Sequence, residues 1–153
     1  MGEPLYFPLF VDLYDKKVLV VGGGKIALRR IQTLADFTAG ITVVAPEVHP
    51  ELLPLEEAGR LRVLRKSYDP GDLTGMDLVL AAGPQELNEA VGADCRRLGI
   101  PVNVSSDRRS SDFYFPGIAR RENLVIGVTA GGLDHAEARR VTEALREFLK
   151  KDE

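Results

Sequence analysis

The sequence has little that could form a disulfide or hold a metal: its 153 residues include one cysteine and two histidines. A single cysteine excludes an internal disulfide. Cys95 lies in a helical pattern with no histidine nearby, which favours a structural role over a nucleophilic one. His49 and His135 are far apart in the chain, and we interpret them as surface or capping residues. We therefore expect no metal site.

Long apolar runs and a marked excess of either charge are also missing. No run approaches the roughly 20 residues of a membrane-spanning helix. The amino terminus lacks a basic region followed by an apolar core, so we expect no signal peptide. The sequence begins Met-Gly, as in a myristoylation motif, but that motif has Ser or Thr at position 6, where this chain has Tyr6. We therefore expect no myristoylation. With 20 basic and 23 acidic residues, the chain lacks the basic excess of a nucleic-acid binder. Together these features favour the cytoplasm.

The most informative stretch is an apolar, β-branched run, residues 18–21, that ends at three glycines and passes directly into a helical pattern. Gly22 permits a tight turn. Gly24 leaves room for a pyrophosphate against the backbone, and Ala27 lets helix and strand pack closely. The first N–H groups of the helix would then face the phosphates. A plain surface turn is the alternative, but the strand before the glycines and the helix after them favour a dinucleotide site. We therefore predict that Gly22, Gly23 and Gly24 bind the cofactor, with its pyrophosphate over Gly23 and Gly24.

Strand-like and helical stretches alternate through the first two thirds of the chain. Because strands alternating with helices form right-handed βαβ units, we predict an α/β fold: a Rossmann-type, doubly wound parallel sheet in the order 3-2-1-4-5. The predicted strands are residues 17–21, 41–45, 61–64, 77–82 and 100–104. The predicted helices are residues 26–35, 51–58 and 86–98, the last one capped by Gly99.

The two ends of the chain differ from this pattern. Residues 4–14 contain two prolines, which disfavour a helix, and we predict an extended arm with a short edge strand whose apolar side chains cover a sheet edge or a helix flank. After a polar loop, residues 105–112, we predict a strand at 123–129. Asp134 is then a predicted N-cap for a helix that runs to about Lys150. The carboxyl-terminal part is thus a small α+β appendage.

The second predicted strand ends without the acidic residue that usually holds the ribose of NAD. Ala45 stands at that point, and Glu47 follows two residues later, where it either binds the ribose or is an ordinary surface residue. No arginine follows at once to receive a 2′-phosphate, which favours NAD over NADP. Ala82 and Gly83 end the fourth strand at the carboxyl edge, where ligands bind in such sheets, and we include both among the cofactor-binding candidates.

The ordered set of motifs resembles one family. It comprises residues 7–10, 20–27, 42–47, 77–82 and 113–116 with Arg29, Arg30, Asn88, Asn103, Val104, Gly131 and Gly132. The chain resembles, over nearly its whole length, the precorrin-2 dehydrogenase/sirohydrochlorin ferrochelatase module of siroheme biosynthesis, a branch of porphyrin-type tetrapyrrole synthesis. The glycine triplet is common by itself, whereas the ordered set is specific.

The resemblance implies NAD-dependent oxidation of precorrin-2, an anionic tetrapyrrole, to sirohydrochlorin, and in some members insertion of ferrous iron. Lys25, Ile26, Pro46 and Glu47 match positions that contact NAD in the family. The resemblance also implies a homodimer in which the segment after the Rossmann domain exchanges between subunits. We accordingly expect an NAD-binding domain at residues 1–112 and a dimerisation segment at 113–153, shorter than that of the family.

The oxidation requires hydride delivery to the nicotinamide and removal of a proton by a carboxylate. The family carries an aspartate three residues after the asparagine that corresponds to Asn103, and Ser106 stands there in this chain. Asp107 is the predicted catalytic carboxylate, with a solvated turn residue as its alternative, and Asp112 is the second candidate. Arginines available for an anionic substrate are Arg108, Arg109, Arg120, Arg121, Arg139 and Arg140.

Two rival functions remain open at this point. One is an NAD-binding module that has lost catalysis and serves as a sensor or an assembly partner, consistent with Ser106 at the position of the family's aspartate. The other is a sirohydrochlorin ferrochelatase that works without NAD.

Overall fold

In the computed structural model, which describes residues 5–151, the chain forms two units. Val11–Phe113 makes up the first unit. The second unit consists of the arm up to Phe10 together with the chain from Tyr114 onward. The amino-terminal arm therefore belongs with the carboxyl-terminal elements rather than with the predicted NAD-binding domain.

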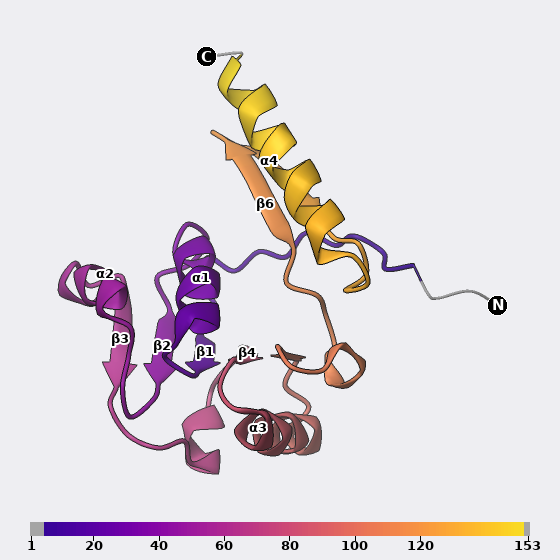
Figure 1. Ribbon diagram of the computed structural model, residues 1–153. Coiled ribbons are helices and arrows are strands. Elements are labelled where there is room, and N and C mark those ends of the chain that lie inside the picture. The colour runs from indigo at the N-terminus through magenta and orange to yellow at the C-terminus, as the bar shows by residue number, and fades with distance from the viewer. Residues whose placement is uncertain (1–4, 152–153) are drawn as a thin grey trace. The chain divides into compact units, whose positions relative to one another are not determined.

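The first unit contains a five-stranded parallel sheet in the order β3-β2-β1-β4-β5, which confirms the predicted fold class and order (Figure 1). The order reverses between the neighbouring strands β1 and β4, so their carboxyl ends form the switch point at which such sheets bind ligands. The strands are β1 (Val18–Val21), β2 (Ile41–Val44), β3 (Leu61–Leu64), β4 (Leu78–Ala81) and β5 (Val102–Val104).

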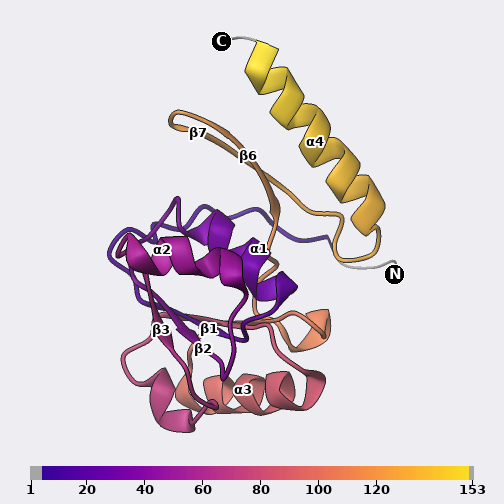
Figure 2. The ribbon, with the colours of Figure 1, turned by 60° about the vertical axis from the view of Figure 1, so that its left-hand side comes forward.

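Helices cover both faces of this sheet. Figure 2 shows α1 and α2 on one face and α3 on the other. The predicted helix at 51–58 begins as a 3₁₀ turn and becomes α-helical only from Leu53. Pro54 has no N–H with which to make an α-helical bond to the Pro50 carbonyl. Gly99 ends α3 in the left-handed conformation, as predicted. The helices are α1 (Lys25–Leu34), α2 (Leu53–Glu57) and α3 (Gln85–Leu98), with 3₁₀ turns η1 (Pro50–Leu52), η2 (Pro70–Leu73) and η3 (Arg108–Ser110).

The core lies on the two faces of β1, whose four side chains are fully buried. Leu19 and Val21 belong to a cluster with Val91 and Cys95 of α3 on one face. Complete burial of a valine or leucine contributes roughly 1.5–3 kcal/mol, so this strand is a main source of the unit's stability. A continuous apolar run with no alternation is what a strand covered on both faces requires.

Cys95 is expected to be unreactive toward a thiol reagent at pH 8 while the protein is folded. Its side chain is fully buried, and desolvation raises the pKa of the Cys95 thiol to about 11. The thiol is therefore protonated at pH 8, and the nucleophilic thiolate is scarce. Absorbance with a chromogenic disulfide should report no fast reaction in buffer and one equivalent in denaturant. A rapid stoichiometric reaction of the native protein would contradict the structural role of Cys95.

The second unit is a β-hairpin with a helix packed on it. Strands β6 (Gly117–Arg121) and β7 (Leu124–Val128) pair antiparallel, and α4 (His135–Lys151) contacts mainly β6. Gly117 lies under α4, where a Cβ atom would come within 2.4 Å of Thr142 Oγ1. Asp134 caps α4 as predicted, since its carboxylate accepts a hydrogen bond of 2.9 Å from the backbone N–H of Glu137. None of the helices in residues 5–151 combines the length and apolarity needed to cross a membrane.

The prediction of a short edge strand in the arm is wrong for the described residues, because residues 5–14 form no strand. Tyr6 packs its ring edge-on against Tyr114, with the ring centroids 4.3 Å apart. The side chains of Leu5 and Phe7, however, are 99% and 87% exposed, so they do not cover a sheet edge or a helix as predicted. Pro8 has no N–H to donate to a strand partner, which disfavours pairing at this point.

Candidate functional site

The turn after β1 fits closely against the end of β4. Gly22 has a φ of +128°, which an L side chain rarely adopts, and a Cβ atom there would lie 2.4 Å from the carbonyl oxygen of Ala82. The backbone N–H of Ala82 in turn donates to Val21 O at 2.8 Å. Both the positive φ and the nearby Ala82 carbonyl therefore require a glycine at position 22. Gly22 is buried.

The next glycine joins this turn to the loop after β2. A Cβ atom on Gly23 would come within 2.2 Å of the Glu47 carbonyl oxygen. The Gly23 carbonyl accepts a hydrogen bond of 2.7 Å from the backbone N–H of His49. The loop after β1 therefore contacts both the loop after β2 and the end of β4, and we call residues 22–24, 45–49 and 82–83 the cradle.

Gly24 differs from the two preceding glycines because it faces open space. A Cβ atom there would meet no other heavy atom within 4 Å. Gly24 is the N-cap of α1, and in this described segment the helix has neither a side-chain cap nor an acidic residue in its first turn. Its first N–H groups lack partners within the helix, and the positive end of the helix dipole lies there. The cradle thus fits the pyrophosphate of a dinucleotide.

The structure brings most of the predicted cofactor residues together at this edge of the sheet. Gly24, Pro46 and Glu47 are exposed on the cradle, Lys25 and Ile26 are exposed next to it at the start of α1, and Gly83 is half-buried. Ala82 is buried, with 8% of its surface exposed, and it supports Gly22 from below through its backbone. The cofactor contacts of these residues remain predictions.

Sequence reasoning assigned no role to one buried polar group at the same edge, the side chain of Asn88. This side chain, on α3, is fully buried. Its Oδ1 accepts a hydrogen bond of 2.9 Å from the backbone N–H of Gly83. Its Nδ2 lies 3.1 Å from Ser106 Oγ and 3.4 Å from Ser105 Oγ. The sequence signal was an asparagine on the same helix face as Val91 and Cys95, which follow it three and seven residues later. A polar group buried on such a face is almost always hydrogen-bonded.

The two carboxylates predicted for catalysis lie on the chain after β5. Asp107 caps η3: its carboxylate accepts hydrogen bonds from Ser110 Oγ at 2.7 Å and from the backbone N–H of Arg109 at 3.0 Å. These bonds, that of Ser110 above all, hold the pKa of the Asp107 carboxyl below its usual value. Asp112 accepts from the backbone N–H of Val102 at 2.9 Å, at the start of β5.

A second polar link lies on the α1 side of β5. Arg30 of α1 donates from its guanidinium to Oδ1 of Asn103, and Nδ2 of Asn103 donates to the Phe113 carbonyl at 2.9 Å. Asn103 therefore ties β5 both to α1 and to the last residue of the first unit. Desolvation lowers the pKa of Arg30, with a smaller contribution from Arg29.

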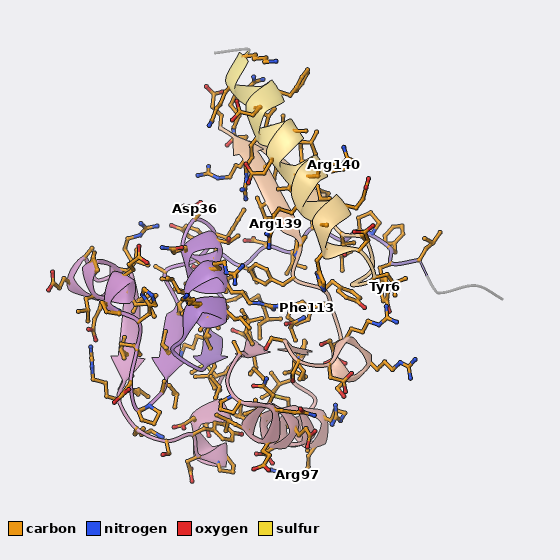
Figure 3. The ribbon with its side chains drawn as sticks, in the orientation of Figure 1. Tyr6, Asp36, Arg97, Phe113, Arg139 and Arg140 are labelled. Atoms are coloured by element: carbon orange, nitrogen blue, oxygen red, sulfur yellow. The ribbon has the colours of Figure 1, made fainter. Side chains whose placement is uncertain are left out.

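The arginines predicted for an anionic substrate are divided between the two units. Arg108 and Arg109 lie on η3 in the first unit. In the second unit, Arg139 and Arg140 extend from α4 (Figure 3), and Arg140 donates to Glu137 at 2.7 Å. Arg120 is exposed on β6, whereas Arg121 donates to the Leu149 carbonyl at 3.0 Å. Arg121 and Arg140 thus already serve the second unit's own structure.

A parallel sheet with a switch point, a tight glycine turn and an open helix N-terminus define a Rossmann-type dinucleotide-binding protein. The family model described as putative NAD(P)-binding matches residues 9–117. The solved structure of "SirC, precorrin-2 dehydrogenase" superposes with a TM-score of 0.80 at 30% identity, covering 94% of this chain and 70% of that chain. This chain therefore belongs to the precorrin-2 dehydrogenase family of NAD(P)-binding proteins.

Curated relatives agree with this assignment. A siroheme synthase of Chromobacterium violaceum is 40% identical over 145 residues, which cover 94% of this chain and 31% of that protein. A siroheme synthase of Pseudomonas putida is 42% identical over 145 residues, which likewise cover 94% of this chain and 31% of that protein. The chain thus spans less than a third of the length of these relatives.

Proposed function

We propose that this protein catalyses the NAD-dependent oxidation of precorrin-2 to sirohydrochlorin in siroheme biosynthesis. The observation that carries the proposal is the cradle, whose open Gly24 and uncapped helix fit a pyrophosphate in a chain 30% identical to a precorrin-2 dehydrogenase. Its composition, with one buried cysteine, favours the cytoplasm as the location.

The reaction removes a hydride and a proton from the reduced tetrapyrrole, with two electrons leaving as the hydride. Bound NAD supplies the acceptor for that hydride. The chain supplies the cradle, which orients the dinucleotide, and a carboxylate, for which we propose Asp107, which takes the proton. The arginines on η3, Arg108 and Arg109, are proposed to attract the substrate's carboxylates.

The test is an assay of the purified protein with precorrin-2 and NAD. NADH and sirohydrochlorin should appear together and in equal amounts, both followed by absorbance. Omitting NAD is the control, and product formation without NADH would contradict the proposal. NADP in place of NAD should support less turnover, since no arginine follows Ala45 directly.

A second candidate function is a nucleotide-binding module without catalysis. The observation that favours it is the chain after β5, where Ser106 stands at the position of the family's aspartate and the carboxylate of Asp107 is engaged by its own turn. If this alternative is correct, the absorbance assay should show no NADH, while calorimetry should still show that the protein binds NAD. A ferrochelatase without NAD would instead insert ferrous iron into sirohydrochlorin in an assay lacking the dinucleotide.

We further propose that the protein is a homodimer assembled through its second unit. Large apolar side chains on this unit are strongly exposed, among them Phe7, Phe10, Leu124 and Phe148. Several large apolar side chains exposed on one small unit are more than such a unit usually leaves to solvent, which suggests an interface. One face of the β6–β7 hairpin packs against α4, and Ile118 and Val125 lie on its other face by strand alternation.

Sedimentation at about 10–50 μM, where micromolar interfaces are populated, should show a dimer. Phe148→Asp should shift the protein toward monomer, because a charge in an apolar interface must be desolvated. Leu98→Asp is the matched control: Leu98 is 53% exposed but lies on α3 of the first unit, and this variant should remain dimeric. A monomeric wild type would rule out the homodimer at these concentrations.

A further inference from the structure

Asn88 occupies a place where a helix normally presents an apolar side chain to the core. It is fully buried, as are Val91 and Cys95 further along α3. An amide in such a place is unfavourable unless each of its polar atoms is hydrogen-bonded. The structure satisfies the oxygen and the nitrogen of Asn88 with partners on two different loops. Because the amide has a distinct acceptor end and donor end, it fixes the two loops in one arrangement.

The first of these loops belongs to the cradle. Oδ1 of Asn88 accepts from the Gly83 N–H, and Gly83 directly follows Ala82, against which Gly22 packs. A shift of the glycine turn is therefore transmitted to Gly83 through backbone contact. Close-packed backbone moves as a unit because interiors have little free volume.

The second loop is the start of the chain after β5, and we call residues 105–107 the β5 loop. Nδ2 of Asn88 donates to Ser106 Oγ and more weakly to Ser105 Oγ. The backbone of the β5 loop is held at two further points, from Ser105 N to Ala81 O at 2.9 Å and from Asp107 N to Val104 O at 3.1 Å. Asn88 thus links the cradle to the segment that carries Ser106 and Asp107.

We propose that Asn88 is a positioning residue that couples occupation of the cradle to the placement of the β5 loop. The inference rests on the proposed function, since it assumes that the cradle holds the dinucleotide and that the β5 loop faces the substrate. Asn88 acts through Gly83 on one side and through Ser106 on the other. Its predicted effect is therefore on turnover and on communication between the loops, with little effect on NAD affinity.

The test compares wild type with Asn88→Ala by hydrogen–deuterium exchange with and without NAD, together with kcat and KM. In wild type, NAD should slow exchange both at residues 22–28 and at residues 104–110. In Asn88→Ala the slowing at 22–28 should persist, while the slowing at 104–110 should be lost. kcat should fall by about 10–10²-fold, the range expected for a misplaced reacting group, while the KM for NAD changes less than about threefold.

Two further variants keep the test decisive. Glu89→Ala, an exposed neighbour on the same helix, should behave as wild type. The double variant Ser105→Ala/Ser106→Ala removes the same link from the loop side and leaves the core intact, so it replaces Asn88→Ala if that protein fails to fold. Unchanged kcat together with undiminished slowing at 104–110 in the variant that is used would overturn the inference. Coupled protection in a wild type that makes no NADH would instead reject the proposed function and leave the coupling standing.

Discussion

Gly24→Asp is expected to abolish NAD binding while leaving the fold intact. The side chain can be accommodated, because a Cβ atom at Gly24 meets no other heavy atom within 4 Å and the residue has an ordinary negative φ of −89°. The new carboxylate would lie where the pyrophosphate is expected, and juxtaposed like charges cost several kcal/mol. Affinity should fall at least about 100-fold, because each 1.4 kcal/mol is tenfold. Calorimetry measures the binding, and thermal unfolding measures the stability.

Two controls separate the role of Gly24 from those of its neighbours. Ala93→Asp adds the same charge at an exposed position of α3, so it should bind NAD as wild type does. Gly22→Ala should instead lower the unfolding temperature, because its Cβ would overlap the Ala82 carbonyl and its φ of +128° is strained for alanine. Normal NAD affinity in Gly24→Asp would remove the cradle as the dinucleotide site.

Asp107→Asn is expected to reduce kcat by about 10²–10⁴-fold, the usual contribution of a positioned general base, with NAD affinity unchanged. Asparagine keeps an oxygen that can accept from the N–H of Arg109, so the η3 turn should survive. Because the pKa of Asp107 is lowered, its carboxylate stays ionised to a lower pH than an ordinary aspartate. Protonation of this group should therefore reduce the kcat/KM of wild type only below about pH 4, near the usual aspartate value.

Asp112→Asn is the matched control, because it makes the same chemical change at a carboxylate held by the backbone of Val102. It should lose less activity than Asp107→Asn. Equal activity of Asp107→Asn and wild type would reject Asp107 as the base. If wild type is inactive, Ser106→Asp becomes the informative variant, since its carboxylate could accept from Nδ2 of Asn88, which lies 3.1 Å from Ser106 Oγ. Turnover gained by that substitution would identify wild type as a nucleotide-binding module that has lost catalysis.

The fold could be predicted from local pattern because its central strands are short, continuous apolar runs that alternate with helical stretches. Residues 61–64 form a strand with the predicted bounds, and Gly99 ends α3 as expected. The arm could not be predicted in the same way. An edge strand depends on a partner strand elsewhere in the chain, and nothing in the local pattern of residues 5–14 specifies one.

The candidate site shows the same division between local and tertiary information. The spacing of the glycines predicts the turn, but not that Gly22 packs against Ala82 or Gly23 against Glu47. Asp107 looks like a free loop carboxylate in the sequence, whereas the structure uses it to cap η3. Asn88 is only a polar residue in an amphipathic helix until β4 and β5 are placed side by side. Each of these features depends on contacts between segments far apart in the chain.

The bond from the His49 N–H to the Gly23 carbonyl has a consequence for how cofactor preference can evolve. It fixes the backbone of the loop after β2, while the side chain of Glu47 remains exposed. If Glu47 holds the ribose, as the sequence predicts, substitutions of its side chain will change what a ribose or a 2′-phosphate meets without disturbing the main chain of the cradle. Selection could then act on nucleotide choice at this one position almost independently of folding stability, whereas Gly22, the first residue after β1, has no such freedom because its positive φ and the Ala82 carbonyl restrict it.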